Sequence, residues 1–164
     1  MEKLYDLPDL KQLQEWKTYD QKGYRALIKM ISKNKKILIL ATKNSGKNTI
    51  QHSVVNYIHR MHSEILVIPS LEGINLPKMK ANKKVTQLKK MCKDQKSYIA
   101  CIQHEGDWEM PVSEFVTEFS GWFECVLDLR FYEGQRILCA IYDGKKSYKC
   151  IYKHEFVRTN RVAA

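Results

Sequence analysis

Apolar residues recur along the chain at helical spacing in some segments and in short continuous runs in others. Apolar positions three or four apart define one face of a helix. In one such segment this face is formed by Ile50, Val54, Ile58 and Met61. The spacing predicts helices at 7–18, 20–33, 47–62 and 83–93, and a short helix at 111–120.

Continuous apolar runs stand between these helical segments. The run "ILIL" at 37–40 contains no polar position, which is typical of a strand covered by helices on both faces of a parallel sheet. Two similar runs lie at 64–69 and 98–102, and a turn-rich segment containing Gly and Pro lies at 70–78. Helices that alternate with such strands predict a right-handed βαβ core.

The last third of the chain has a different pattern. Three segments alternate apolar and polar positions more strictly: 125–132, 135–143 and 147–158. Turn residues separate them, and Asp143-Gly144 between two β-rich segments is a strong hairpin signal. This part predicts an antiparallel meander at one edge of the parallel sheet.

One domain of α/β class accounts for all 164 residues. We expect three parts: N-terminal helices at 1–33, a βα core at 37–109 and a β-meander at 125–158. No stretch holds 18 consecutive apolar residues, so no transmembrane segment is predicted. The charged N-terminus has no apolar signal core, and we expect a cytoplasmic protein.

The segment "ATKNSGKNT" at 41–49 has the position of a phosphate-binding loop, because a predicted strand precedes it and a predicted helix follows. Such a loop needs N–H groups that face phosphate, a lysine, and a hydroxyl directly after the lysine for Mg²⁺. Gly46-Lys47 supplies the lysine. However, Ala41 stands at the first glycine position and Asn48 at the hydroxyl position, with Thr49 one residue later.

Two interpretations of this loop stay open. In the first, it binds nucleotide through Lys43, Asn44, Ser45, Gly46, Lys47, Asn48 and Thr49. In the second, it is an ordinary strand-to-helix turn in which Asn44, Ser45 and Asn48 serve as capping residues.

Taken in order, the segments resemble the motor domain of secretion traffic ATPases, the hexameric motors of type II and type IV secretion, conjugation and tight-adherence pili. "LIKMISKNKKILILATKNSGKNTIQHSVVNYI" resembles the family's helix, strand and glycine-rich loop. "EILVIPSLEGINLP" stands at its second strand and acidic box, and "LKKMCKDQKSYIACIQHEGDWE" at the helix and strand ending in Gly-Glu-x-Arg-x-x-Glu. "VLDLRFYEGQRILCAIYDGKKSYKCIYKHEFVR" is similar to the closing strands with their Gly-Arg-Arg turn.

This resemblance covers residues from about 7 to 158. It implies a P-loop NTPase fold of the RecA-like type, with a three-layer core, a mainly parallel sheet and antiparallel C-terminal edge strands. It also implies ATP or ADP, with or without Mg²⁺, as the cofactor.

The chain departs from the family where the chemistry should be. Pro69-Ser70 replaces the acidic pair, and His104 stands at the third-strand glutamate, with Glu105 one residue later. Glu109 matches the second glutamate, but the short interval up to Cys125 lacks the Thr-x-His box. Phosphoryl transfer depends on several positioned charges, so their loss predicts a pseudo-ATPase with Glu105 and Glu109 as weak acid candidates.

Such a relative is expected to act as a structural or regulatory component of a secretion or DNA-transfer machine. The implied partners are a secretion or conjugation protein, an intact ATPase paralogue, or further copies of the chain. The implied location is the cytoplasm, including the inner face of the membrane. A weak but active NTPase is an alternative, because Lys47 is retained.

A formal net charge of +10 supports a further alternative, a small basic nucleic-acid-binding protein of a mobile element. The densest lysine block lies at 78–96, and its candidate contacts to nucleic acid are Lys83, Lys89, Lys90 and Lys93. A solvated helix face explains the block equally well. No aromatic residue interleaves it, so the sequence does not indicate base stacking there.

The remaining reactive residues predict no metal site. Five scattered cysteines form no CxxC and are expected to be reduced, mostly buried thiols. His52, His59 and His62 lack a carboxylate or thiol at matching spacing and are expected at the surface. Five aromatic residues near the shortened region are expected in the core: Trp108, Phe115, Phe119, Trp122 and Phe123.

Overall fold

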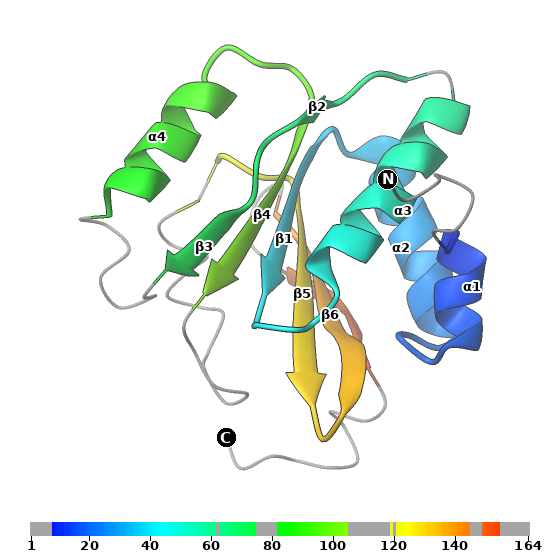
Figure 1. Ribbon diagram of the computed structural model, residues 1–164. Coiled ribbons are helices and arrows are strands. Elements are labelled where there is room, and N and C mark those ends of the chain that lie inside the picture. The colour runs from blue at the N-terminus through cyan, green and yellow to red at the C-terminus, as the bar shows by residue number, and fades with distance from the viewer. Residues whose placement is uncertain are drawn as a thin grey trace.

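The computed structural model describes residues 8–61, 63–74, 82–104, 119, 121–144 and 149–154, except for the side chain of Tyr132. A twisted sheet forms the centre, and helices cover both of its faces (Figure 1). The described part of the chain is therefore an α/β fold with a mixed, mostly parallel sheet, as the apolar pattern predicted.

The sheet has the strand order β2-β4-β1-β5-β6-β7, and β3 also pairs with β4. Strands β1 to β5 run parallel, whereas β6 and β7 are antiparallel to their neighbours. The strands are β1 (Lys36–Ala41), β2 (Leu66–Val67), β3 (Leu71–Ile74), β4 (Tyr98–His104), β5 (Cys125–Tyr132), β6 (Gln135–Asp143) and β7 (Lys149–Lys153).

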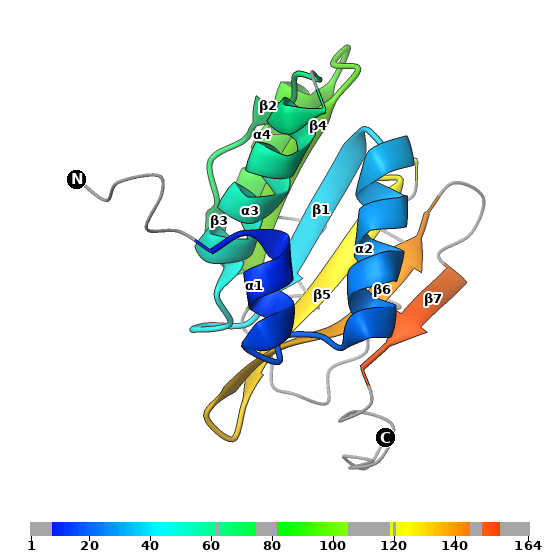
Figure 2. The same ribbon diagram turned by 90° about the vertical axis from the view of Figure 1, so that its right-hand side faces the viewer.

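In the described ranges, three helices cover one face of the sheet and one covers the other. Figure 2 shows α1, α2 and α3 together on one face. Because successive strand residues point to opposite faces, Ile37 and Ile39 pack with the first group, whereas Leu38 and Leu40 pack towards the single helix. The first group is α1 (Leu10–Glu15), α2 (Gln21–Lys33) and α3 (Lys47–Arg60), and the single helix is α4 (Lys83–Cys92).

Polar side chains fix where three of the helices begin. The carboxylates of Asp9 and Asp20 accept backbone N–H bonds at the starts of α1 and α2, and the Asn82 side chain does so at α4. Such caps satisfy N–H groups that have no partner within the helix. The start of α3 has no side-chain cap, because its N-cap residue is Gly46.

The carboxyl ends of β1, β3, β4 and β5 lie together at one end of the sheet. Helix α3 carries the chain from β1 towards β2, whereas β5 lies on the other side of β1. The direction of the connections therefore changes at β1. In open α/β sheets, ligands bind outside the carboxyl ends of the strands at such a switch point.

Two predicted elements differ from the observed ones. The apolar run at 64–69 forms only the two-residue strand β2, whose side chains are exposed, and the adjacent strand β3 lies within the segment predicted as turns. Met61, predicted on the buried face of α3, is exposed because the helix ends at Arg60. The short helix predicted at 111–120 lies almost wholly outside the described residues.

Candidate functional site

The loop between β1 and α3 is the centre of the candidate site. It contains two residues in left-handed conformation, Asn44 (φ 63°) and Gly46 (φ 85°). Ser45 is buried between them and folds back on the loop, because its hydroxyl and its N–H both donate to the carbonyl of Thr42, at 2.7 and 3.3 Å. The loop thus has a defined shape without any ligand.

Strand β5 holds the beginning of this loop. The N–H of Thr42 donates to the carbonyl of Leu129 at 3.2 Å, and its hydroxyl accepts a bond from the N–H of Phe131 at 3.0 Å. Since Ala41 still lies within β1 and pairs with both Gln103 and Leu129, the turn itself begins only at Thr42.

The first turn of α3 offers backbone N–H groups that receive no side-chain cap within the described residues, since the N-cap residue is Gly46. The prediction that Asn44, Ser45 or Asn48 caps this helix was therefore wrong. The N-terminus of a 14-residue helix carries partial positive charge, and together with uncapped N–H groups it attracts anions. This end of α3 has the features needed to bind a phosphate or a carboxylate.

Lys47, the first residue of α3, forms an ion pair with a residue of β3 at the carboxyl end of the sheet. Its ammonium lies 3.3 Å from a carboxylate oxygen of Glu72 on β3. The Lys47 side chain is only 12% exposed, whereas that of Glu72 is 62% exposed. Burial raises the pKa of the Cys101 thiol to about 12, and the nearby charge of Lys47 opposes that rise.

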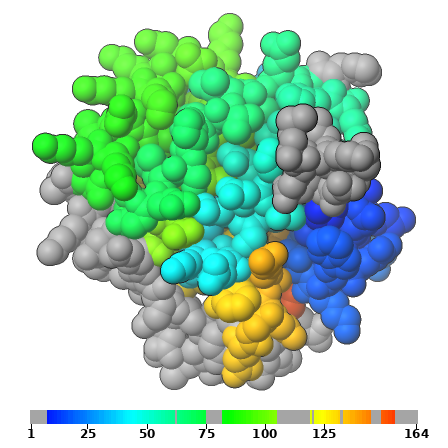
Figure 3. Space-filling model, viewed as in Figure 1, coloured from blue at the N-terminus to red at the C-terminus, as the bar shows by residue number. Residues whose placement is uncertain are grey.

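Arg136 brings a second cation to the loop from the start of β6. A Cβ atom built on Gly46 would lie 3.2 Å from Cδ of Arg136. In Figure 3 the first residues of β6, in orange, lie against the loop and the start of α3, in cyan. Two cationic side chains, Lys47 and Arg136, therefore flank an uncapped helix N-terminus.

The other predicted loop residues have less defined roles. Lys43, Asn44 and Asn48 are exposed, and Thr49 is half-buried. Glu105 and Glu109, the weak acid candidates, lie outside the described residues. Within the residues that the structure describes, no group of three or more His, Cys, Asp or Glu side chains is placed to hold a metal ion.

A buried charge pair lies on β5, on the side of the sheet covered by α4. Arg130 Nε donates to a carboxylate oxygen of Asp128 at 3.0 Å, and both side chains are almost fully buried. Burial raises the pKa of Asp128 although Arg130 opposes the rise. Burial also acts to lower the pKa of Arg130, but the charge of Asp128 and the hydrogen bond to it oppose this, and the pKa of Arg130 is raised.

The last residue of β4, His104, is also buried. Burial, followed by the charge of Arg130, lowers the pKa of His104 to about 4. Neither ring nitrogen of His104 finds a hydrogen-bond partner in the described part of the chain. A neutral imidazole in this position fits a packing role better than that of a proton donor.

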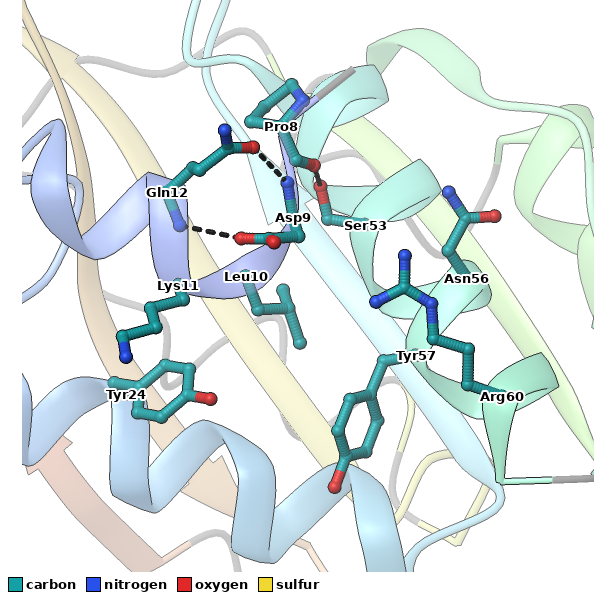
Figure 4. Close-up of a pocket in the computed structure, with 10 residues that line it drawn as sticks. All are labelled: Pro8, Asp9, Leu10, Lys11, Gln12, Tyr24, Ser53, Asn56, Tyr57 and Arg60. Carbon is teal, nitrogen blue, oxygen red and sulfur yellow. Dashed lines mark hydrogen bonds between the residues drawn. The ribbon is translucent and has the colours of Figure 1, made fainter. Parts of the chain in front are cut away.

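A separate pocket of about 510 Å³ lies between α1, α2 and α3 (Figure 4). Several of its polar groups serve the fold. The Asp9 carboxylate and the Gln12 side chain form a capping box, and the Ser53 hydroxyl donates to the carbonyl of Pro8 at 2.6 Å. The Ser53 bond docks the start of α1 on α3, so the pocket follows from helix packing.

The lysines of the predicted nucleic-acid face do not share one environment. Lys83, Lys90 and Lys93 are exposed. The ammonium of Lys89 instead lies 5.2 Å from the ring centre of Phe119 and 5.9 Å from that of Trp122. Aromatic residues distant in sequence are thus brought to α4, which the local pattern could not reveal.

Several expectations about single residues are confirmed. Phe119 and Phe123 are buried, and Trp122 is partly buried against the same core. His52 and His59 are exposed. All five cysteines are thiols, and four are buried: Cys92, Cys101, Cys125 and Cys139. Trp108, Phe115 and His62 lie outside the described residues.

No protein-family model and no curated protein matches the chain. None of the helices in the described ranges combines the length and the apolar character needed to cross a bilayer.

Proposed function

We propose that the chain is a catalytically inactive relative of the secretion and conjugation traffic ATPases, with a RecA-like P-loop fold. The observation that carries the proposal is the ion pair between Lys47 and Glu72. The lysine stands at the N-terminus of the helix that follows the first strand, which is where a P-loop lysine meets phosphate. In this chain the ammonium is paired with an internal carboxylate, that of Glu72.

The loop retains enough positive charge to bind the phosphates of ATP or ADP. Uncapped N–H groups at the start of α3, the ammonium of Lys47 and the nearby Arg136 all favour an anion. Nucleotide binding requires Glu72 to leave Lys47, and this is feasible because the Glu72 side chain is largely exposed. Nucleotide therefore binds weakly and in competition with Glu72.

Hydrolysis requires more than phosphate binding. A metal ligand after the lysine and a carboxylate that orients water are needed to stabilise the developing charge. Asn48 replaces the hydroxyl. Asp128 is buried in its own ion pair with Arg130, and Glu72 is engaged with Lys47. The chain thus acts as a structural or regulatory component, and its partners are an intact ATPase, another secretion or conjugation protein, or further copies of itself.

Nucleotide calorimetry combined with a phosphate-release assay tests this proposal. ATP and ADP are titrated with and without Mg²⁺ into the wild type, into Lys47→Ala and into Lys43→Ala. The last variant removes the same charge from an exposed position of the same loop. We expect weak binding that Lys47→Ala abolishes and Lys43→Ala preserves, with no phosphate release above background.

Two results would contradict parts of the proposal. Mg²⁺-dependent turnover that disappears in Lys47→Ala would show a weak but active NTPase. Absence of binding in the wild type, together with an unchanged fold, would remove the nucleotide from the proposal and leave only the structural role.

A further inference from the structure

A hollow of about 570 Å³ lies at the edge of the sheet opposite to the β1–α3 loop. Lys36 begins β1 and Tyr98 begins β4, and both residues line it. The end of α4 and the turn at 121–122 complete its wall. Neither the loop nor Lys47 takes part in this hollow, and the inference drawn from it is independent of the proposed function.

Three lysines contribute to the wall of the hollow. Among the described residues, Lys36, Lys93 and Lys96 line it together with one acidic residue, Asp94. The chain turns sharply after α4, because Asp94 adopts a left-handed conformation (φ 66°) and the N–H of Gln95 donates to the carbonyl of Cys92 at 3.1 Å. This turn places Lys93 and Lys96 at the same hollow, although two residues separate them.

An aromatic side chain, Trp122, also lines the hollow. The backbone N–H of this residue donates to the carbonyl of Phe119 at 2.9 Å, and its backbone carbonyl accepts a bond from the Tyr98 hydroxyl. The side chain packs against the core beneath α4, and the ammonium of Lys89 lies 5.9 Å from the centre of its ring. The backbone bonds fix the main chain and the packing limits the freedom of the ring, which lowers the entropic cost of binding.

We propose that this hollow, the Lys36–Trp122 pocket, binds single-stranded nucleic acid. A base stacks on Trp122, and the adjoining phosphates contact Lys36, Lys93 and Lys96. Single-strand sites combine such cations with aromatic platforms, and base stacking is sequence-tolerant because every base has a π-face. Lysines near a helix C-terminus also offset the helix dipole, but Lys36 and Lys96 lie outside α4, so the dipole does not account for them.

The pocket favours a single strand over a duplex, because a base within a duplex cannot stack on an indole without leaving its partner. The charged groups that line it are lysines and one aspartate, which contact phosphate or solvent and do not read base edges by bidentate bonds. We therefore expect little sequence preference, and similar affinity for DNA and RNA strands.

Fluorescence anisotropy with labelled oligothymidylate of about 12 nucleotides tests the proposal. The variants are Trp122→Leu and the pair Lys93→Gln with Lys96→Gln. The matched control is Lys22→Gln with Lys29→Gln, which removes the same charge from exposed positions of α2 that do not line the pocket. We expect Trp122→Leu to weaken binding by about tenfold or more. The Lys93/Lys96 pair should also lower the salt dependence of log K by about 1.4, whereas the control should bind much as the wild type.

Gly121 supplies a second test that leaves the aromatic core intact. Its φ is +82°, and a Cβ atom built on it meets no atom within 4 Å. Asn and Asp both tolerate this backbone conformation, so Gly121→Asn and Gly121→Asp differ mainly in charge. We expect the aspartate variant to bind oligothymidylate several-fold more weakly than the asparagine variant. Oligouridylate should behave like oligothymidylate, and Lys47→Ala should bind like the wild type.

Three outcomes would overturn the proposal. One is equal weakening by the pocket pair and by the control pair, which would indicate diffuse attraction by the basic surface. Another is equal binding of the Gly121→Asp and Gly121→Asn variants. The third is a duplex of the same length that competes as well as the single strand.

Discussion

The ammonium of Lys47 and the carboxylate of Glu72 form an ion pair at 3.3 Å that joins the first turn of α3 to β3. The pair spans 25 positions of the sequence and lies at the carboxyl edge of the sheet. It places an internal anion where an external one would otherwise bind. The affinity of the loop for phosphate is therefore set by competition between Glu72 and the ligand.

Replacement of Glu72 by Gln should strengthen anion binding. The neutral amide no longer pairs with Lys47, so the ammonium becomes available to pyrophosphate or ADP. The increase is expected to be about tenfold or less, because a partly exposed ion pair contributes about 1 kcal/mol or less. Isothermal calorimetry with pyrophosphate measures it.

The matched control for this experiment is Glu64→Gln. It removes the same charge from an exposed position just before β2, at the opposite edge of the sheet. An equal gain in both variants would mean that net charge alone controls binding, and that the ion pair has no specific effect.

Gly46→Ala should destabilise the fold and disturb Arg136. An alanine at φ +85° costs about 1–2 kcal/mol of backbone strain, and its Cβ also meets the Arg136 side chain. Gly134→Ala is the comparison, because its φ is +77° but its Cβ enters open space. Urea unfolding should show a larger loss of stability for Gly46→Ala, and the excess should vanish in an Arg136→Ala background. If Gly46→Ala still loses more stability than Gly134→Ala in the Arg136→Ala background, the extra loss comes from the backbone alone.

Removal of one member of the buried pair on β5 should be costly. Asp128→Leu removes the carboxylate that pairs with the buried Arg130 guanidinium. Loss of one partner of a buried ion pair typically costs about 3–5 kcal/mol, whereas an apolar pair of similar volume is often neutral. Thermal or urea unfolding should therefore show that Asp128→Leu with Arg130→Met is more stable than Asp128→Leu alone. Two equally unstable variants would contradict this account.

Stability should fall in mild acid because of His104. Its pKa is lowered to about 4 in the folded chain, against about 6.5 when unfolded, so the unfolded state binds a proton first as the pH falls. The contribution of neutral His104 to the free energy of unfolding is complete above the unfolded-state pKa, and it is lost progressively between about pH 6.5 and pH 4. Between pH 7 and pH 5 the loss is about 2 kcal/mol.

Urea unfolding at the two pH values, with His104→Gln as control, measures this loss. The variant lacks the titrating ring, so the wild type should lose more stability than the variant on going from pH 7 to pH 5. Parallel losses in the two proteins would mean that carboxylates, and not His104, cause the acid sensitivity.

The sequence predicted most of the fold because burial follows local periodicity. Val85, Leu88 and Cys92 repeat at helical spacing and are the residues that α4 buries. The apolar run at 37–40 marked β1, which lies between two parallel neighbours. The apolar run at 64–69 also indicated a strand, although only two of its residues pair as β2. The short β3 carried no such signal, because its pairing with β4 is a tertiary contact.

The site was predictable only in its local part. Gly46-Lys47 indicated the loop because strand, turn and helix follow one another in sequence. Glu72 and Arg136 reach the loop from β3 and β6, and no spacing rule connects them to it. The same limit applies to Trp122, which lies 30 positions beyond the end of α4 and still lines a pocket with Lys93 and Lys96.

The outermost strand β7 also affects how the chain behaves towards copies of itself at high concentration. An open strand edge is a template for aggregation, and proteins protect such edges with lysine side chains. In the described part of the chain, β7 is the last strand on its side of the sheet, and exposed lysines stand at both of its ends, Lys149 and Lys153. At the other edge, β2 and β3 are only two and four residues long and offer little backbone for pairing. Part of the lysine excess therefore contributes to colloidal stability, a role that requires no ligand at all.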